Sequence, residues 1–141
     1  MEVDNIVKIL HIKNKVKTPL DLVELEKKGL PKKSVILLGR FFSATNSDMA
    51  SWLLVSPKTI WRYNKNLKGL LKHRESERVL KLAMLASRCK DVFEGTEICN
   101  EWLRSNNTAL GGKTPFSLMQ SNMGIEMVLT ELGRIEYGVI S

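Results

Sequence analysis

The feature that most constrains the fold is a helical spacing of apolar residues that recurs along most of the chain. It is clearest in residues 75–93, ESERVLKLAMLASRCKDVF, where Val79, Leu82, Ala83 and Ala86 fall three or four positions apart. The run at 121–137 repeats this spacing, and its predicted buried face consists of Ile125, Val128, Leu129, Leu132 and Ile135. No segment shows a strand pattern of comparable strength. We therefore predict an all-α fold.

Helix starts can be placed from capping residues. Thr18-Pro19, Ser56-Pro57 and Thr114-Pro115 each join a side-chain cap to a proline at the first helical position. Pro31 is predicted to open a further helix, and Gly29 to end the one before it. That earlier helix is expected to bury Leu20, Leu22, Val23 and Leu25, and a helix capped by Thr96 is expected to bury Ile98, Cys99, Trp102 and Leu103. Residues 1–17 permit no assignment.

Residues 45–66, TNSDMASWLLVSPKTIWRYNKN, have the pattern of a helix-turn-helix. Thr45 and Asp48 form a cap signature, and Ala50 allows close crossing of two short helices. Leu54 occupies the turn position where glycine is common, so we expect a widened or shifted turn. The residues predicted to face DNA from the second helix are Lys58, Thr59, Arg62, Tyr63 and Lys65. Helix pairs with a polar outer face also occur in proteins that never bind DNA.

Charge divides the chain into two parts. The net charge is +7. Residues 1–74 hold 15 Lys/Arg against 6 Asp/Glu, a balance of +9, and residues 75–141 hold 7 against 9, a balance of −2. A basic half can attract DNA, RNA or an anionic membrane surface. It can equally serve solubility, and charge alone favours neither alternative.

Composition indicates a folded cytoplasmic domain that needs no metal or cofactor. The N-terminus lacks the pattern of a signal peptide, and no apolar run approaches the length of a membrane span. Cys89 and Cys99 fall among apolar helical positions, so buried free thiols are expected rather than a disulfide. His11 and His73 have no cysteine or acidic partner at ligand spacing, which makes a structural metal site improbable.

The stretch ALGGKTP at 109–115 contains the Gly-Lys-Thr with which many phosphate-binding loops end. The full motif requires a glycine at position 107, where this chain has Asn107, and Pro115 follows at once. A helical segment precedes the stretch, whereas the motif needs a strand. We therefore predict that Gly111 and Gly112 form a tight turn, that Lys113 lies in solvent, and that no ATP or GTP binds.

From residue 75 onward the order of motifs resembles the antitoxins of the Xre/MbcA/ParS group, the partners of RES-type toxins. The resemblance rests on ESER at 75–78, DVF at 91–93, Trp102-Leu103, ALGGKTP at 109–115, Met123-Gly124 and the tail LGRIEYGVIS at 132–141. It covers roughly the last 65 residues strongly. The upstream helix-turn-helix is similar to the DNA-binding half of this family more loosely.

The resemblance implies a two-part antitoxin. Residues 1–74 would bind operator DNA of the protein's own operon as a homodimer and act as a transcriptional repressor. Residues 75–141 would dimerise and bind a RES toxin, which degrades NAD⁺ or uses it for ADP-ribosylation. The last helix and tail would cover the toxin's active-site cleft. The toxin-binding residues expected from this are Arg134, Glu136, Tyr137, Val139, Ile140 and Ser141.

Two alternatives belong to other functional classes. An enzyme would need convergent titratable groups, and the sequence motifs contain no histidine near a serine, cysteine or carboxylate cluster, with the acidic residues placed on solvent faces of helices. We therefore predict that the chain is not an enzyme. A helix-turn-helix transcriptional regulator with a dimerisation domain and no toxin remains open. Whether the neighbouring reading frame encodes a protein of toxin size distinguishes this alternative from an antitoxin.

Overall fold

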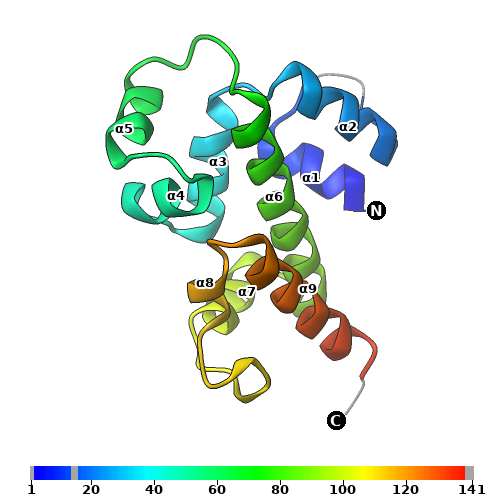
Figure 1. Ribbon diagram of the computed structural model, residues 1–141. Helices are drawn as coiled ribbons and strands as arrows, with labels where there is room; N and C mark the ends of the chain where they lie inside the picture. Colours follow the sequence, from blue (N-terminus) through cyan, green and yellow to red (C-terminus); the bar gives the residue numbers. More distant parts are fainter. Residues whose placement is uncertain (1, 14–15, 139–141) are drawn as a thin grey trace.

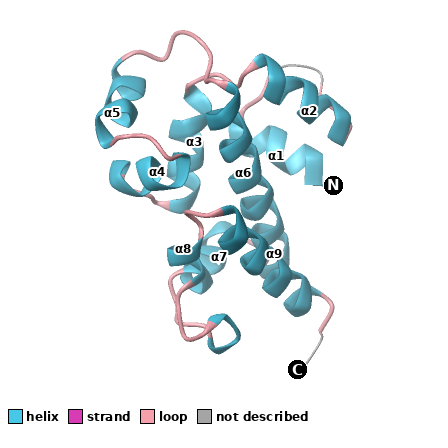
Figure 2. Cartoon of the chain, viewed as in Figure 1, coloured by secondary structure: helices cyan, strands magenta, loops and turns pink. Residues whose placement is uncertain are grey.

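A computed structural model describes residues 2–13 and 16–138, and every regular element in these ranges is a helix (Figure 1, Figure 2). This confirms the predicted all-α fold. The elements are α1 (Glu2–Leu10), α2 (Pro19–Lys28), α3 (Lys33–Phe42), α4 (Asn46–Leu53), α5 (Pro57–Lys65), α6 (His73–Phe93), α7 (Thr96–Leu103), the 3-10 helix η1 (Thr108–Leu110), α8 (Pro115–Leu118) and α9 (Asn122–Glu136). None of the described helices is both long and apolar enough to span a membrane.

The long helix α6 forms the centre of the fold (Figure 1). Helices α1, α2, α3, α4, α7 and α9 all pack against it, and α1 reaches its last turn, where Asn5 Nδ2 donates to the Asp91 carboxylate. Its side chains Val79, Leu82, Ala83 and Ala86 are fully buried, as the sequence pattern predicts. The core is therefore continuous from one end of the molecule to the other, with α6 contributing to both ends.

The predicted caps form because each depends only on residues a few positions apart. Thr18 and Thr45 accept hydrogen bonds from the backbone N–H groups of Asp21 and Asp48, which complete two capping boxes. Ser56 and Thr114 cap α5 and α8 in the same way. Helix α3 starts two residues after Pro31, since Pro31 instead forms an isolated bridge with Leu70.

Several apolar faces differ from the prediction. Leu25 is buried, but Leu20 and Val23 are exposed on α2, as are Ile98 on α7 and Ile135 on α9. Helix α7 begins at Thr96 itself, with Gly95 as its cap. The unassigned N-terminal segment forms α1, which buries Val3, Ile6 and Leu10 against the core. The differences in burial arise because a neighbouring helix covers one face and leaves another exposed. The spacing of apolar residues within a helix does not show which face a neighbour will cover.

Candidate functional site

The turn between α4 and α5 keeps the compact form of a helix-turn-helix. Leu54 adopts a left-handed conformation with φ 58°, and its N–H bonds to the carbonyls of Ala50 and Ser51. The expected widening of the turn is therefore wrong, because the leucine backbone itself takes the conformation that glycine usually provides. Ile60 is buried and Val55 packs against the core, so apolar residues of the turn and of α5 hold the two helices together.

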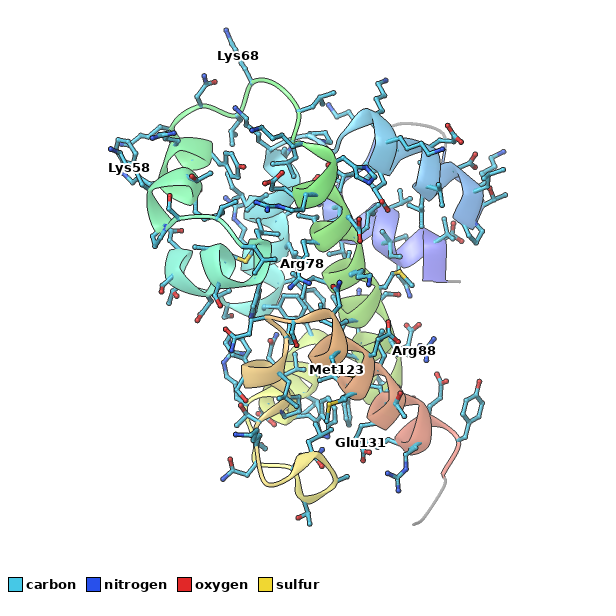
Figure 3. All side chains as sticks on the ribbon, in the orientation of Figure 1. Lys58, Lys68, Arg78, Arg88, Met123 and Glu131 are labelled. Carbon is cyan, nitrogen blue, oxygen red and sulfur yellow. A yellow bond between two sulfur atoms is a disulfide. The ribbon has the colours of Figure 1, made fainter. Side chains whose placement is uncertain are left out.

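Helix α5 presents a basic outer surface. Lys58, Arg62 and Lys65 are exposed, and Lys58 extends from the outer edge of the molecule in Figure 3. Thr59 and Tyr63 are only partly exposed. The Thr59 hydroxyl lies 3.0 Å from the Ser56 hydroxyl at the helix cap, and the Tyr63 ring packs against the core with the Lys32 Nζ atom 5.7 Å from its centroid. Burial raises the pKa of Tyr63, and the charge of Glu75 raises it further.

Trp61 and Lys68 add to this surface but are absent from the predicted set. Trp61 is exposed, and the Lys65 Nζ atom lies 5.4 Å from its ring centroid. Lys68 extends from the loop that follows α5 (Figure 3). An exposed tryptophan four residues before a lysine on one helix was the signal that could have identified Trp61. The surface thus combines basic side chains with an exposed aromatic ring.

The second surface follows α9. Met123 is 74% exposed and Tyr137 is 79% exposed, with Met127 also exposed between them. With Thr130 and Arg134 these residues recur at three- and four-residue intervals along one stripe of the helix. Met123, Met127, Thr130 and Arg134 also line a shallow groove of about 260 Å³ between α9 and the loop around Leu110. The methionines were not predicted, although their spacing relative to Arg134 was visible in the sequence.

The predicted toxin-binding residues divide into two groups. Glu136 and Tyr137 are exposed at the end of α9, as expected. Arg134 was expected to be exposed, but it is partly buried. Its Nη1 lies 3.3 Å from Glu131 Oε2, because residues three positions apart lie side by side on a helix. Val139, Ile140 and Ser141 lie outside the described residues. Within the described residues, the exposed surface of this region is the stripe on α9.

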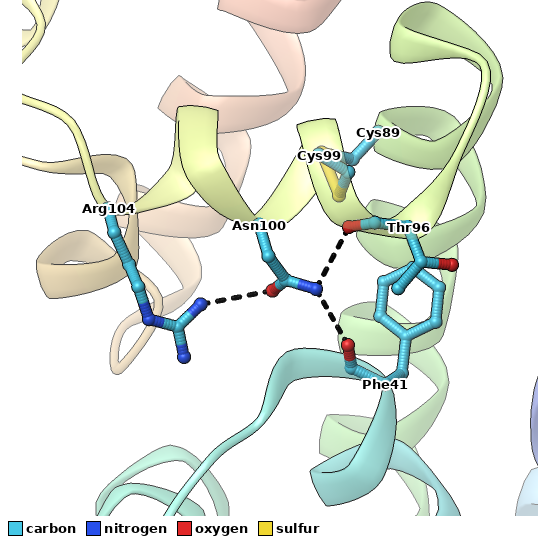
Figure 4. The surroundings of a disulfide bond; sticks show 6 residues. All are labelled: Phe41, Cys89, Thr96, Cys99, Asn100 and Arg104. Carbon is cyan, nitrogen blue, oxygen red and sulfur yellow. Dashed lines mark hydrogen bonds between the residues drawn. A yellow bond between two sulfur atoms is a disulfide. The ribbon is translucent and has the colours of Figure 1, made fainter.

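Two further expectations are corrected by the structure. Cys89 on α6 and Cys99 on α7 are bonded as a disulfide, with Cα atoms 5.5 Å apart, rather than present as free thiols (Figure 4). Helix α7 folds back against α6 after the short Glu94-Gly95 connection, and this brings both sulfur atoms to the same buried position. Glu75 is also buried, whereas all acidic residues were expected on solvent faces.

His73 does have acidic neighbours. Its Nε2 lies 3.6 Å from Glu26 Oε1 and 3.8 Å from Glu77 Oε2, because the docking of α2 on α6 brings Glu26 to it. These three ligand atoms lie within 4.8 Å of one another, and the His73 side chain is mostly exposed. The arrangement is a partly exposed cluster of one imidazole and two carboxylates on the surface.

The loop at 109–115 has the predicted form. Gly111 and Gly112 have φ angles of 73° and 79°, Asn107 and Lys113 form an isolated bridge, and Lys113 is exposed. The loop connects η1 to α8 by a turn that only glycine adopts without strain.

Family comparisons match both parts of the chain. Residues 21–84 match the Antitoxin Xre-like helix-turn-helix domain, and residues 90–138 match the Antitoxin Xre/MbcA/ParS C-terminal toxin-binding domain. The α5 surface lies in the first match and the α9 stripe in the second. The chain belongs to the Xre/MbcA/ParS family of antitoxins. This agrees with the prediction that it is not an enzyme.

Individual relatives agree with this assignment. A Prs ADP-ribosylating antitoxin from Sphingobium sp. (strain YBL2) is 29% identical over 136 residues, covering 88% of this chain and 83% of the relative. Antitoxin Xre from Photorhabdus laumondii subsp. laumondii is 29% identical over 75 residues, covering 52% of this chain and 51% of the relative. A chain in the crystal structure of the M. tuberculosis MbcT–MbcA toxin–antitoxin complex shares the fold, with a TM-score of 0.56 at 18% identity, over 78% of this chain and 96% of that one.

Proposed function

We propose that this antitoxin neutralises a RES-type toxin by covering its active-site cleft with α9 and the tail that follows. The observation that carries the proposal is the stripe of Met123, Met127 and Tyr137, which is apolar and exposed within the domain matched as toxin-binding. Exposed methionines adapt well to a partner surface, and tyrosine is a frequent interface anchor. The name of the Sphingobium relative refers to ADP-ribosylation, a reaction that consumes NAD⁺.

A charge-introducing variant tests toxin binding. Met123→Asp combined with Met127→Asp places two carboxylates in the groove beside Leu110, so the complex should weaken at least a hundredfold, since desolvating each unpaired charge costs several kcal/mol. The control is Met84→Asp, because Met84 is about as exposed as Met127 but lines a different groove, between α1, α2 and α6.

The measurements are pull-down of the toxin encoded beside the antitoxin gene and cellular NAD⁺ upon co-expression. Loss of neutralisation in the double variant but not in the control supports the proposal. Equal neutralisation by all three proteins contradicts it. An assay for ADP-ribosylated protein then distinguishes a toxin that transfers ADP-ribose from one that only degrades NAD⁺.

The α5 surface supports the second part of the proposal, that the antitoxin represses its own operon by binding operator DNA as a cytoplasmic homodimer. One helix-turn-helix covers only a half-site, which is why a dimer is expected. Arg62→Ala should reduce operator affinity by about 1–3 kcal/mol if Arg62 contacts a guanine. Lys113→Ala, which removes an exposed charge far along the chain, is the matched control.

Affinity is measured at several salt concentrations, because phosphate contacts give a steep salt dependence. If the wild-type chain binds the DNA upstream of its own operon no better than random duplex at any salt, operator binding is rejected. Toxin neutralisation is then still tested separately by the methionine variants.

A further inference from the structure

One imidazole and two carboxylates from two helices meet where α2 docks on the start of α6 (Figure 1). His73 is the first residue of α6, Glu77 follows it one turn later, and Glu26 lies near the end of α2. The His73 Nε2 atom lies 3.6 Å from Glu26 Oε1 and 3.8 Å from Glu77 Oε2. All three ligand atoms lie within 4.8 Å of one another. An imidazole nitrogen and carboxylate oxygens are ligands that a divalent transition metal binds together.

The spacing of these three donors fits a metal ion with little rearrangement. Residues four apart on a helix lie on one face, so His73 and Glu77 can bind one ion from a single helix. Zinc–ligand distances of about 2.0–2.2 Å place tetrahedral ligands roughly 3.4 Å apart. The two distances from His73 Nε2 exceed this spacing by only a few tenths of an ångström, which rotation of the side chains can close.

The charges around the cluster favour a cation between the two acids. Glu77 has Lys81 one turn later, a spacing that often gives a helical ion pair, yet its carboxylate is paired with His73 instead. In residues 2–13 and 16–138, neither Glu26 nor Glu77 forms an ion pair with a lysine or an arginine. Two neighbouring carboxylates repel each other, and a neutral imidazole offsets none of that repulsion, whereas a divalent cation offsets all of it.

The donor set also indicates the class of metal. An imidazole nitrogen suits zinc and other transition metals, whereas magnesium and calcium prefer sites made only of oxygen ligands. The Glu26 side chain is 23% exposed and the His73 side chain 57%, so the cluster opens to solvent on one side. Three protein ligands therefore leave a coordination position for water.

We propose that Glu26, His73 and Glu77 bind a divalent transition-metal ion of the zinc type, and that this ion fastens α2 to α6. Sequence spacing does not reveal the site, because Glu26 is distant from His73 in the chain and reaches it only through the docking of the two helices. Glu26 and Glu77 also line the groove between α1, α2 and α6, so the bound ion lies at the rim of that groove. The site does not depend on toxin or operator binding.

Thermal unfolding of the untagged full chain, with and without zinc, is the first test. Zinc at about a hundred times its dissociation constant should raise the unfolding temperature of the wild-type chain by about 5–10 °C. His73→Asn should abolish this rise, because asparagine is too short to replace the imidazole nitrogen. The matched control is His11→Asn, at the other histidine, which should keep the full rise. Asparagine also tolerates the left-handed backbone of that position, with φ 49°.

Two further variants and conditions make the test specific. Glu26→Gln keeps the shape of the side chain but removes its charge, so it should weaken zinc binding at least tenfold in a calorimetric titration. Magnesium at the same concentration should leave the wild-type unfolding temperature unchanged. Each variant is first unfolded in a chelator, so that a folding defect is not counted as a loss of binding. The chain is kept oxidised, because Cys89 and Cys99 then offer no thiolate.

Direct evidence for the ligand comes from NMR of the imidazole nitrogens. Zinc should shift the Nε2 signal of His73 and leave the signals of His11 unchanged, at one zinc ion per chain. An equal rise in unfolding temperature for the wild-type chain and His73→Asn places the zinc elsewhere and overturns the proposal. A wild-type chain without any zinc-dependent rise or heat of binding also overturns it, since the cluster is then only a set of polar contacts. An equal effect of magnesium overturns the assignment to a transition metal.

Discussion

Leu54 holds the helix-turn-helix in a backbone conformation that leucine rarely adopts. A left-handed L-residue costs about 1–2 kcal/mol, and glycine in its place costs about 0.4–1 kcal/mol through the entropy of the unfolded chain. The Leu54 side chain is mostly exposed, so little burial is lost. We predict that Leu54→Gly raises the free energy of unfolding by about 0.5–1 kcal/mol in chemical denaturation. Leu67→Gly, at an exposed leucine without positive φ, should not raise the free energy of unfolding. An equal increase in both variants would contradict the explanation.

Asp21 contributes to stability in a pH-dependent way. Its carboxylate accepts hydrogen bonds from the backbone N–H groups of Lys17 and Thr18 at 2.9 and 3.1 Å, and these bonds hold its pKa below the usual value for an aspartate. A lowered folded-state pKa contributes stability above the unfolded value, and this is lost as pH falls through the folded value. Asp21→Asn should therefore lower the free energy of unfolding at pH 6, and this loss should shrink as the pH falls into the acid range. If the effect of Asp21→Asn on the free energy of unfolding is the same at every pH, the capping carboxylate is not the cause.

At the scale of elements, the Cys89–Cys99 bond ties α7 to α6 across a sequence separation of 10. Closing a loop of this size in the unfolded chain is worth about 2–3 kcal/mol. We predict that full reduction lowers the unfolding temperature, and that Cys89→Ala with Cys99→Ala makes it insensitive to reductant. Thermal unfolding is followed with thiol titration to verify reduction. An unchanged wild-type transition after complete reduction would show that packing alone holds α7.

The elements also show what the sequence could and could not predict. Caps such as Thr45 with Asp48 follow from residues three apart, so their prediction succeeded. The pairing of Cys89 with Cys99 and the exposure of Leu20 depend on how helices dock, which periodicity does not contain. At the sites, Lys58 and Arg62 were predicted because charge marks a solvated face. Met123 and Met127 were not, because apolar residues on a helix are usually assigned to the core. The placement of toxin and operator on these surfaces remains a prediction.

At the scale of the whole molecule, α6 belongs to both parts of the chain. It runs from His73 to Phe93 across the predicted boundary between residues 74 and 75, and it buries side chains against helices on either side. That boundary stays a prediction. We expect a fragment of residues 1–74 to lack cooperative folding, because α1, α2 and α3 would lose the helix on which they pack. Calorimetry of the fragment should show no sharp transition, whereas residues 1–94 should retain one; a cooperative 1–74 fragment would place the boundary where the sequence predicts it.

The last turn of α9 and the residues after it are not needed for the buried core. The buried residues of α9 end at Leu132, and beyond it Arg134 pairs with Glu131 while Tyr137 projects into solvent. Deleting residues 134–141 should therefore leave a folded protein that binds operator DNA as well as the full chain does. It should release the toxin, seen as NAD⁺ depletion or growth arrest upon co-expression, because it removes an interface aromatic and the arginine of the stripe. A shorter deletion of residues 139–141 separates the tail from the helix end. If the longer truncation still neutralises the toxin at equal abundance, the inhibitory contact lies earlier on α9, at Met123 and Met127.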